Sequence, residues 1–204
     1  MGRVTRRHGP LTPLAAEFCR WWSERFPAAW PIGWSLREHG PREWLRIHSL
    51  PGSRRGPDDD ADWNELLARH REVATTVLGD RFDCWIVVGH DIDEPPPVEL
   101  GALAPAPVAR VEPIELIDRW TVAGQLALAF AVARAPWDFV CLEPLVRASA
   151  RGDLASLVIA SAEVPGQLYA PYEGGADLFF HRFCEHDDAL RRFRPWLSPR
   201  PDGL

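Results

Sequence analysis

The sequence contains no lysine: all 23 of its basic residues are arginines. Lysine forms the Schiff base of amine catalysis, and it contacts the phosphates in Walker loops and in kinase-type nucleotide sites. The sequence therefore excludes Schiff-base enzymes, Walker-type nucleotide hydrolases and enzymes with a kinase-type nucleotide site.

Cysteine pairs and long apolar runs are also missing. The four cysteines are widely separated and form no CxxC motif, which favours buried free thiols over a disulfide framework. No apolar run approaches the ~20 residues that span a bilayer, and no N-terminal stretch joins a basic region to an apolar segment of signal length. We therefore predict a cytoplasmic protein that does not interact with membranes.

The sequence also lacks an excess of positive charge. The chain carries 29 acidic residues against its 23 arginines, which gives a net charge of -6 with neutral histidines. Because binding to nucleic acid requires a basic face that neutralises phosphates, we expect no nucleic-acid partner.

Apolar and aromatic residues are abundant, with 46% hydrophobic residues and 10 tryptophans. Side chains of this kind fill a sizeable core, and 204 residues suffice for one large domain. We predict a disordered tail over residues 1–10 and a single domain over 11–204, with a proline- and alanine-rich irregular segment at 93–113.

Apolar residues at helical spacing predict four helices. In the first, Thr12 supplies the capping hydroxyl, and Pro13 stands where its missing N–H costs nothing. The second has the longest apolar face and ends at Gly79. The last is expected to turn Leu190 toward the core. The predicted helices cover residues 13–25, about 60–78, 143–152 and 185–196.

The predicted strands alternate with these helices without a regular strand–helix–strand repeat. Runs at 32–36 and 44–50, separated by His39-Gly40-Pro41, are interpreted as a hairpin. A second hairpin is expected around Glu173-Gly174-Gly175, where two glycines permit the positive φ of a tight turn. Further strands are expected at 84–88 and 154–161. The apolar run at 126–133 is compatible with a helix or a strand, and its position before Ala135-Pro136-Trp137 favours a strand. The pattern indicates a single-domain α+β fold with a largely antiparallel sheet flanked by helices, and a doubly wound parallel sheet is the alternative.

Two segments carry residue types suited to acid–base chemistry. Arg46 and His48 alternate along a strand, so their side chains leave the same face. The second hairpin contains both tyrosines of the chain. Arg46, His48 and Asp177 are candidate catalytic residues, and Tyr172 and Glu173 are candidate ligand-binding residues. A structural role is the alternative for each of them.

A glycine-flanked loop contains two further candidates, Arg54 and Arg55. Guanidinium groups in such a loop can hold a phosphate or a carboxylate through bidentate contacts. A solvated loop without a ligand is the alternative.

A segment near the C-terminus offers three potential metal ligands, His181, Cys184 and His186. Structural zinc motifs present paired ligands at repeated spacings, which this chain lacks. The acidic residues that follow Cys184 suit the first turn of a helix without any metal. We therefore predict no metal and no other cofactor.

Two motifs resemble those of a known group of proteins. They are the RIHSLP segment (46–51) and the hairpin segment (169–177), which reads YAPYEGGAD. They are similar to an "RIHSLP" strand and a "YxPYDGGAD" hairpin in uncharacterised bacterial proteins, which form a domain-of-unknown-function family. The resemblance covers most of the chain in order and implies a cytoplasmic module with no assigned activity. The sequence departs from that pattern after Pro51, where Gly52-Ser53-Arg54-Arg55 replaces a stretch containing Glu and Lys.

Two functional hypotheses follow. The first is a non-enzymatic protein-binding or accessory module, immunity-like or regulatory, because the chain is acidic, has no complete catalytic constellation and has aromatic residues available for a protein interface. The second is a small enzyme of hydrolase or transferase type that uses a pocket between the 46–49 strand and the hairpin segment. A pocket shared by both segments would favour the enzyme, and a flat exposed aromatic patch would favour a protein partner.

Overall fold

The computed structural model describes residues 11–79, 83–91, 106–115, 125–198 and 200. Within these residues, seven strands form one sheet in the order β1-β7-β6-β5-β2-β4-β3, and every neighbouring pair is antiparallel. The strands are β1 (Glu43–His48), β2 (Asp83–Asp91), β3 (Ala106–Glu115), β4 (Gln125–Pro136), β5 (Ser156–Ser161), β6 (Leu168–Tyr172) and β7 (Gly175–Phe180). The predicted single-domain α+β fold with an antiparallel sheet is confirmed, and the parallel alternative is wrong.

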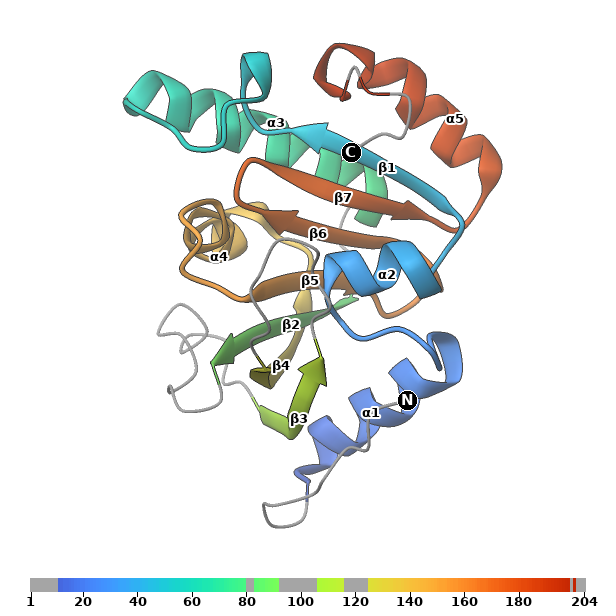
Figure 1. Ribbon diagram of the computed structural model, residues 1–204. Coiled ribbons are helices and arrows are strands. Elements are labelled where there is room, and N and C mark those ends of the chain that lie inside the picture. Colours follow the sequence, from blue (N-terminus) through green and yellow to red (C-terminus); the bar gives the residue numbers. More distant parts are fainter. Residues whose placement is uncertain (1–10, 80–82, 92–105, 116–124, 199, 201–204) are drawn as a thin grey trace.

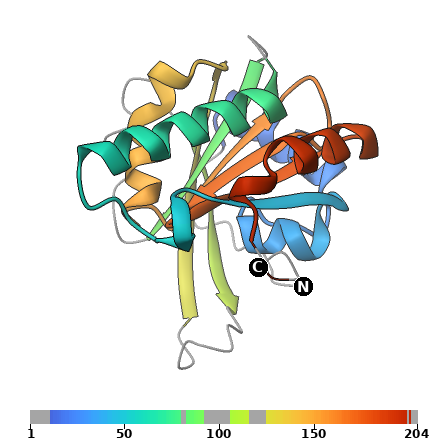
Figure 2. The same cartoon turned by 90° about the horizontal axis from the view of Figure 1, so that it is seen from above.

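Helices cover both faces of the sheet (Figure 1). They are α1 (Pro13–Arg25), α2 (Gly33–His39), α3 (Asp60–Leu78), α4 (Phe139–Ala150) and α5 (Phe183–Arg192), with 3-10 turns at Pro51–Ser53 and Arg194–Trp196. Residues of α1 and α2 share one apolar cluster with the sheet, and residues of α3, α4 and α5 share another. Figure 2 shows α2 and α5 on opposite sides of β1. The fold is therefore a central sheet between two helical layers.

The two longest helices, α1 and α3, have the predicted bounds, and a side chain caps the N-terminus of each. The Thr12 hydroxyl accepts a hydrogen bond from the Ala15 N–H at 3.2 Å, and α1 has the predicted bounds. The Asp59 carboxylate accepts from the Asp62 N–H at 2.9 Å at the start of α3. Gly79, with φ of 75°, follows α3 in a conformation that residues with a Cβ rarely adopt.

The predicted hairpin at 32–36 and 44–50 is wrong. Residues 33–39 form α2, and the Gly40 N–H closes this helix by donating to the Leu36 carbonyl at 2.7 Å. β1 pairs instead with β7, far along the chain. Glycine and proline after a short apolar run end a helix as readily as they form a turn, so the local sequence did not distinguish the two.

The predicted irregular segment at 93–113 is wrong in part. Residues from Ala106 onward belong to β3, which forms an edge of the sheet and pairs with β4 through an irregular register. Proline is tolerated in an edge strand, so Pro107 and Pro113 do not prevent pairing. The rest of that segment, 93–105, and the predicted tail over 1–10 lie outside the described residues.

Two later helices begin earlier than predicted. Asp138 caps α4 by accepting from the Val140 N–H at 2.9 Å, which leaves Pro144 inside the helix rather than at its start. α5 begins at Phe183, and Leu190 is 38% exposed although the helical pattern placed it toward the core. Phe193, immediately after α5, is fully buried.

β1 forms the other edge of the sheet, and groups from outside the sheet cover its outer side. They are the His186 Nε2, which donates to the Trp44 carbonyl at 3.2 Å, the Arg69 Nη1, which donates to the His48 carbonyl at 3.2 Å, and Leu197, which forms an isolated antiparallel bridge with Ile47. Two of the outward-facing carbonyls of this strand therefore have side-chain donors. Within the described residues, no helix is both long and apolar enough to cross a membrane.

Candidate functional site

The RIHSLP segment and the hairpin segment lie side by side. Arg46 stands opposite Asp177 and His48 opposite Gly175 in the register of β1 and β7. The Ser49 N–H extends this pairing by donating to the carbonyl of Gly174 in the turn, at 2.9 Å. The two motifs that the sequence singles out are thus neighbouring strands of one sheet.

The candidate side chains also share a face of that sheet. Tyr172 on β6 stands opposite Gly175, so Tyr172, Gly175 and His48 form one row across three strands. Directly opposed residues of antiparallel strands point to the same face. A Cβ on Gly175 would lie 2.6 Å from the Tyr172 hydroxyl oxygen, so the absence of a side chain at this position makes room for the tyrosine.

Asp177 is the centre of a buried ion-pair cluster. Its carboxylate, only 1% exposed, accepts from Arg46 Nε at 2.9 Å and from Arg46 Nη2 at 3.3 Å. Arg37 Nη1 donates to the same carboxylate at 2.5 Å. Because Arg37 lies on α2, the cluster connects α2, β1 and β7.

Arg37 was missed by the sequence analysis, which interpreted its surroundings as part of a hairpin. It is 140 positions from Asp177 in the chain, and no local pattern links the two. Aromatic rings complete the cluster: the Arg46 guanidinium carbon lies 4.9 Å from the ring centre of Tyr172 and 5.7 Å from that of Trp44. This packing stabilises a guanidinium that has left bulk water.

Tyr172 is held in its protonated form. Its pKa is raised to about 12, chiefly by burial and to a smaller extent by the Asp177 carboxylate, while the charges of Arg46 and Arg37 oppose the shift. A phenol with this pKa can donate a hydrogen bond at neutral pH but cannot serve as a base.

His48 differs from the other candidates because one of its ring nitrogens has no hydrogen-bond partner among the described residues. Burial lowers its pKa, and the positive charges of Arg46 and Arg69 lower it further, so the ring is neutral at pH 7. Its Nε2 is buried without a hydrogen-bond partner among the described residues. A neutral imidazole nitrogen without a partner can accept a proton or a hydrogen bond.

A second polar group, the buried hydrogen-bonded chain Ser49–His70–Tyr169, lies on the opposite face of the sheet. The Ser49 Oγ is 2.7 Å from His70 Nε2, and the Tyr169 hydroxyl oxygen is 2.5 Å from His70 Nδ1. All three residues are 0% exposed. His70 lies among the buried residues of α3, and the two hydroxyl groups give its ring the hydrogen-bond partners that a buried polar group needs.

The Ser49–His70 contact resembles a catalytic nucleophile and its base, but both residues are buried where no substrate can reach them. A serine with no exposed surface cannot contact a ligand. With a neutral imidazole one ring nitrogen donates and the other accepts, so both ring nitrogens of His70 have a hydroxyl partner. The buried chain therefore connects β1, α3 and β6 as a structural element.

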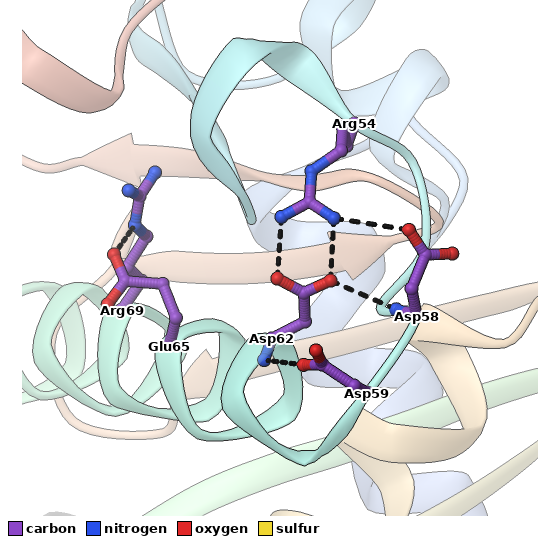
Figure 3. Close-up of polar contacts among 6 residues, drawn as sticks. All are labelled: Arg54, Asp58, Asp59, Asp62, Glu65 and Arg69. Atoms are coloured by element: carbon purple, nitrogen blue, oxygen red, sulfur yellow. Dashed lines mark hydrogen bonds and ion pairs between the residues drawn. The ribbon is translucent and has the colours of Figure 1, made fainter.

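The glycine-flanked loop that contains Arg54 and Arg55, here called the arginine loop, already contacts carboxylates of the same protein (Figure 3). Arg54 donates to Asp62 Oδ2 at 2.6 Å and to Asp62 Oδ1 at 2.5 Å, and a third contact to Asp58 spans 3.3 Å. Hydrogen bonding to Arg54 lowers the pKa of Asp62. An external anion would have to displace these contacts, which leaves Arg54 poorly placed as a ligand-binding residue.

Replacing Arg54 with glutamine should leave the thermal unfolding midpoint nearly unchanged. The Arg54–Asp62 pair is at the surface, where solvent and salt screen the attraction. Differential scanning fluorimetry of Arg54→Gln beside Arg191→Gln, another exposed paired arginine, tests this expectation. A midpoint far below that of both wild type and Arg191→Gln would show that the loop contributes to stability.

The other predicted positions are exposed or have backbone partners. Arg55 and Glu173 are exposed, and a Cβ on Gly174 would lie 3.3 Å from the Arg55 Cα, so the arginine loop packs against the hairpin turn. His186 donates to the Trp44 carbonyl. No group of three or more His, Cys, Asp or Glu side chains within the described residues is placed to hold a metal ion.

Comparison with known proteins gives one match. Residues 32–201 match the family model described as a domain of unknown function, DUF3885. No curated protein and no solved structure matches the chain. The match includes both motif segments.

Proposed function

The chain belongs to the DUF3885 family, and we propose that it is a non-enzymatic protein-binding module, with an immunity-like or regulatory role in the bacterial cytoplasm. Its partner binds through α5. The proposal is based on apolar side chains that are exposed on α5. It is also based on the candidate catalytic groups, most of which are already paired with other groups of the protein or are held in one protonation state.

The observation that carries the proposal is an apolar stripe on α5. Phe183 is 68% exposed and Leu190 38% exposed, and they are two of the three large apolar side chains that are exposed among the described residues. Seven positions apart on a helix, they lie on the same side. Ala189 is the buried residue of α5, and it lies about 100° round the helix from Leu190, so the exposed pair is outside the side of α5 that packs on the core. Exposed apolar surface of this kind is typical of protein interfaces.

The candidate catalytic residues support binding over catalysis. Asp177 is enclosed by two arginines, Arg54 is paired with Asp62, and Tyr172 stays protonated at neutral pH. A catalytic acid or base needs a pKa near the working pH and access to its substrate. None of these three groups meets both conditions.

Replacing Phe183 and Leu190 together with serine should abolish binding of the partner. Affinity capture of the tagged protein from its native lysate is expected to retain one stoichiometric partner protein at moderate salt, and the double variant is expected to lose it. With the purified partner, we expect calorimetry to show an affinity at least about 30-fold weaker, since an interface hot spot contributes about 2 kcal/mol or more.

Cys184→Ser is the matched control, because Cys184 is an exposed neighbour on α5 outside the stripe. Retention of the partner by this variant and loss by the double variant would support the assignment to the stripe. Equal capture by all three proteins would show that α5 is not the interface, and capture of no partner by the wild-type protein would contradict the proposed binding module.

A small enzyme of hydrolase or transferase type is the second candidate, and one observation favours it. The RIHSLP and hairpin segments are adjacent, and they place the unpartnered Nε2 of His48 in the same row as Tyr172. A hydrolytic or transfer activity that disappears in His48→Gln, with the fold intact, would replace the binding proposal.

A further inference from the structure

A hollow opens between α3 and the junction of β4 with α4, and none of the residues that line it belongs to α5 or to the motif segments. Its volume is about 810 Å³, within the range of small-molecule sites. The residues that line it are Arg71, Thr75, Pro136, Trp137, Asp138, Phe139 and Val140.

The hollow has an apolar base and an apolar rim. Trp137 and Phe139 are 6% and 5% exposed, and their rings meet edge to face with centres 6.2 Å apart. The Trp137 indole N–H is already satisfied by the Thr75 hydroxyl at 3.4 Å. Val140 is 70% exposed at the first turn of α4 and is one of three large apolar side chains that are exposed among the described residues.

The two charged residues of the hollow differ in what they already bind. Asp138 accepts hydrogen bonds from the Val140 N–H at 2.9 Å and from the Cys141 thiol at 3.4 Å, so both of its carboxylate oxygens have donors. Arg71 is exposed, and its guanidinium carbon lies 5.0 Å from the ring centre of Phe139. Among the residues that the structure describes, Arg71 has no carboxylate within ion-pair distance.

The hollow therefore presents one cation without a counter-ion beside an aromatic and aliphatic surface. A ligand that complements it has a single negative charge and an apolar body. A planar guanidinium forms bidentate hydrogen bonds to a carboxylate, and the rings beside it accept a hydrocarbon. The Thr75 hydroxyl accepts from the indole and keeps its own proton for an acceptor on the ligand.

We propose that this hollow binds a small organic anion, a straight-chain or aryl carboxylate, with its carboxylate on Arg71 and its apolar body against Trp137 and Val140. This site is independent of the α5 stripe, so its failure and the failure of the protein-binding proposal are separate outcomes. It adds a small-molecule ligand to a module whose partner binds elsewhere.

Titration with octanoate tests the proposal, and 1-octanol is the matched probe that lacks the charge. The indole N–H resonance of Trp137 is the reporter, assigned by its loss from the nuclear magnetic resonance spectrum in Trp137→Phe. Octanoate is expected to shift this resonance saturably and to raise the thermal midpoint, since a ligand that binds the folded state stabilises it. Octanol is expected to bind at least tenfold more weakly, because it cannot form charge-assisted hydrogen bonds.

Two variants distinguish the site from nonspecific adsorption. Arg71→Gln is expected to weaken octanoate binding at least tenfold, and Arg191→Gln, an exposed arginine elsewhere, is expected to leave it unchanged. Val140→Asp places a carboxylate at an exposed position without disturbing the core, and it should abolish binding. The proposal is overturned if octanoate leaves the Trp137 resonance unmoved at millimolar concentration, or if octanol and Arg71→Gln bind as well as octanoate and wild type.

Discussion

Lowering the pH from 7 to 4 should reduce the free energy of unfolding by about 3 kcal/mol through His70 alone. Complete burial, with a smaller contribution from the charge of Arg69, lowers the pKa of His70 to about 3 in the folded protein. In the unfolded chain the ring titrates near 6.5. Between these values the unfolded state binds more protons than the folded state, so stability is lost as the pH falls through this window.

Urea denaturation between pH 4 and pH 7 measures this effect. The free energy of unfolding of the wild-type protein depends on pH through every titrating group. Comparison with His70→Asn therefore isolates the contribution of His70. Asparagine retains hydrogen-bonding capacity toward Ser49 and Tyr169 but does not titrate. We expect the variant to be less stable at pH 7 and to lose up to about 1.4 kcal/mol less per pH unit on acidification. Parallel curves for the two proteins would contradict the buried, neutral state of His70.

Replacing Asp177 with asparagine should destabilise the fold by about 3 kcal/mol. The variant keeps the size of the side chain but removes the negative charge that Arg46 and Arg37 face. A charge left buried without its partner is costly, and this cost is moderated here because both guanidinium groups retain some exposure. Chemical denaturation at pH 7 measures the change.

Asp187→Asn is the matched control for Asp177→Asn. Asp187 also pairs with an arginine, Arg191, but on the exposed surface of α5, so we expect a change well under 1 kcal/mol. If Asp177→Asn is as stable as this control and yet loses an activity or a partner, the ion-pair cluster is a functional site rather than a structural one. The two outcomes therefore decide between the main roles considered for Asp177.

Local sequence signals predicted the elements whose causes are local. Thr12 and Pro13 at the start of α1, and the glycine after α3, act on their own neighbours, so those helices lie where expected. The glycines of the hairpin segment likewise determine the turn between β6 and β7. The motif residues Arg46 and Asp177 were identified as candidates for the same reason, since their segments are distinctive along the chain.

Features that depend on distant partners could not be predicted. Whether residues 33–39 became a helix or a strand depended on packing against the sheet, which the apolar run alone did not encode. Arg37 acquired its role only because α2 carries it to Asp177. The partners of His70 come from β6 and from the residue after β1, and no spacing in the sequence connects them.

The covered outer side of β1 limits the addition of a further strand to this edge of the sheet. An open edge strand is a template on which a second copy, or an extended peptide, can add a strand and extend the sheet. Here the side chains of His186 and Arg69 and the Leu197 bridge occupy that template. Self-association into continuous β-structure from this edge is thereby disfavoured. A partner approaching β1 meets side chains rather than free backbone, so its recognition depends on shape and surface chemistry.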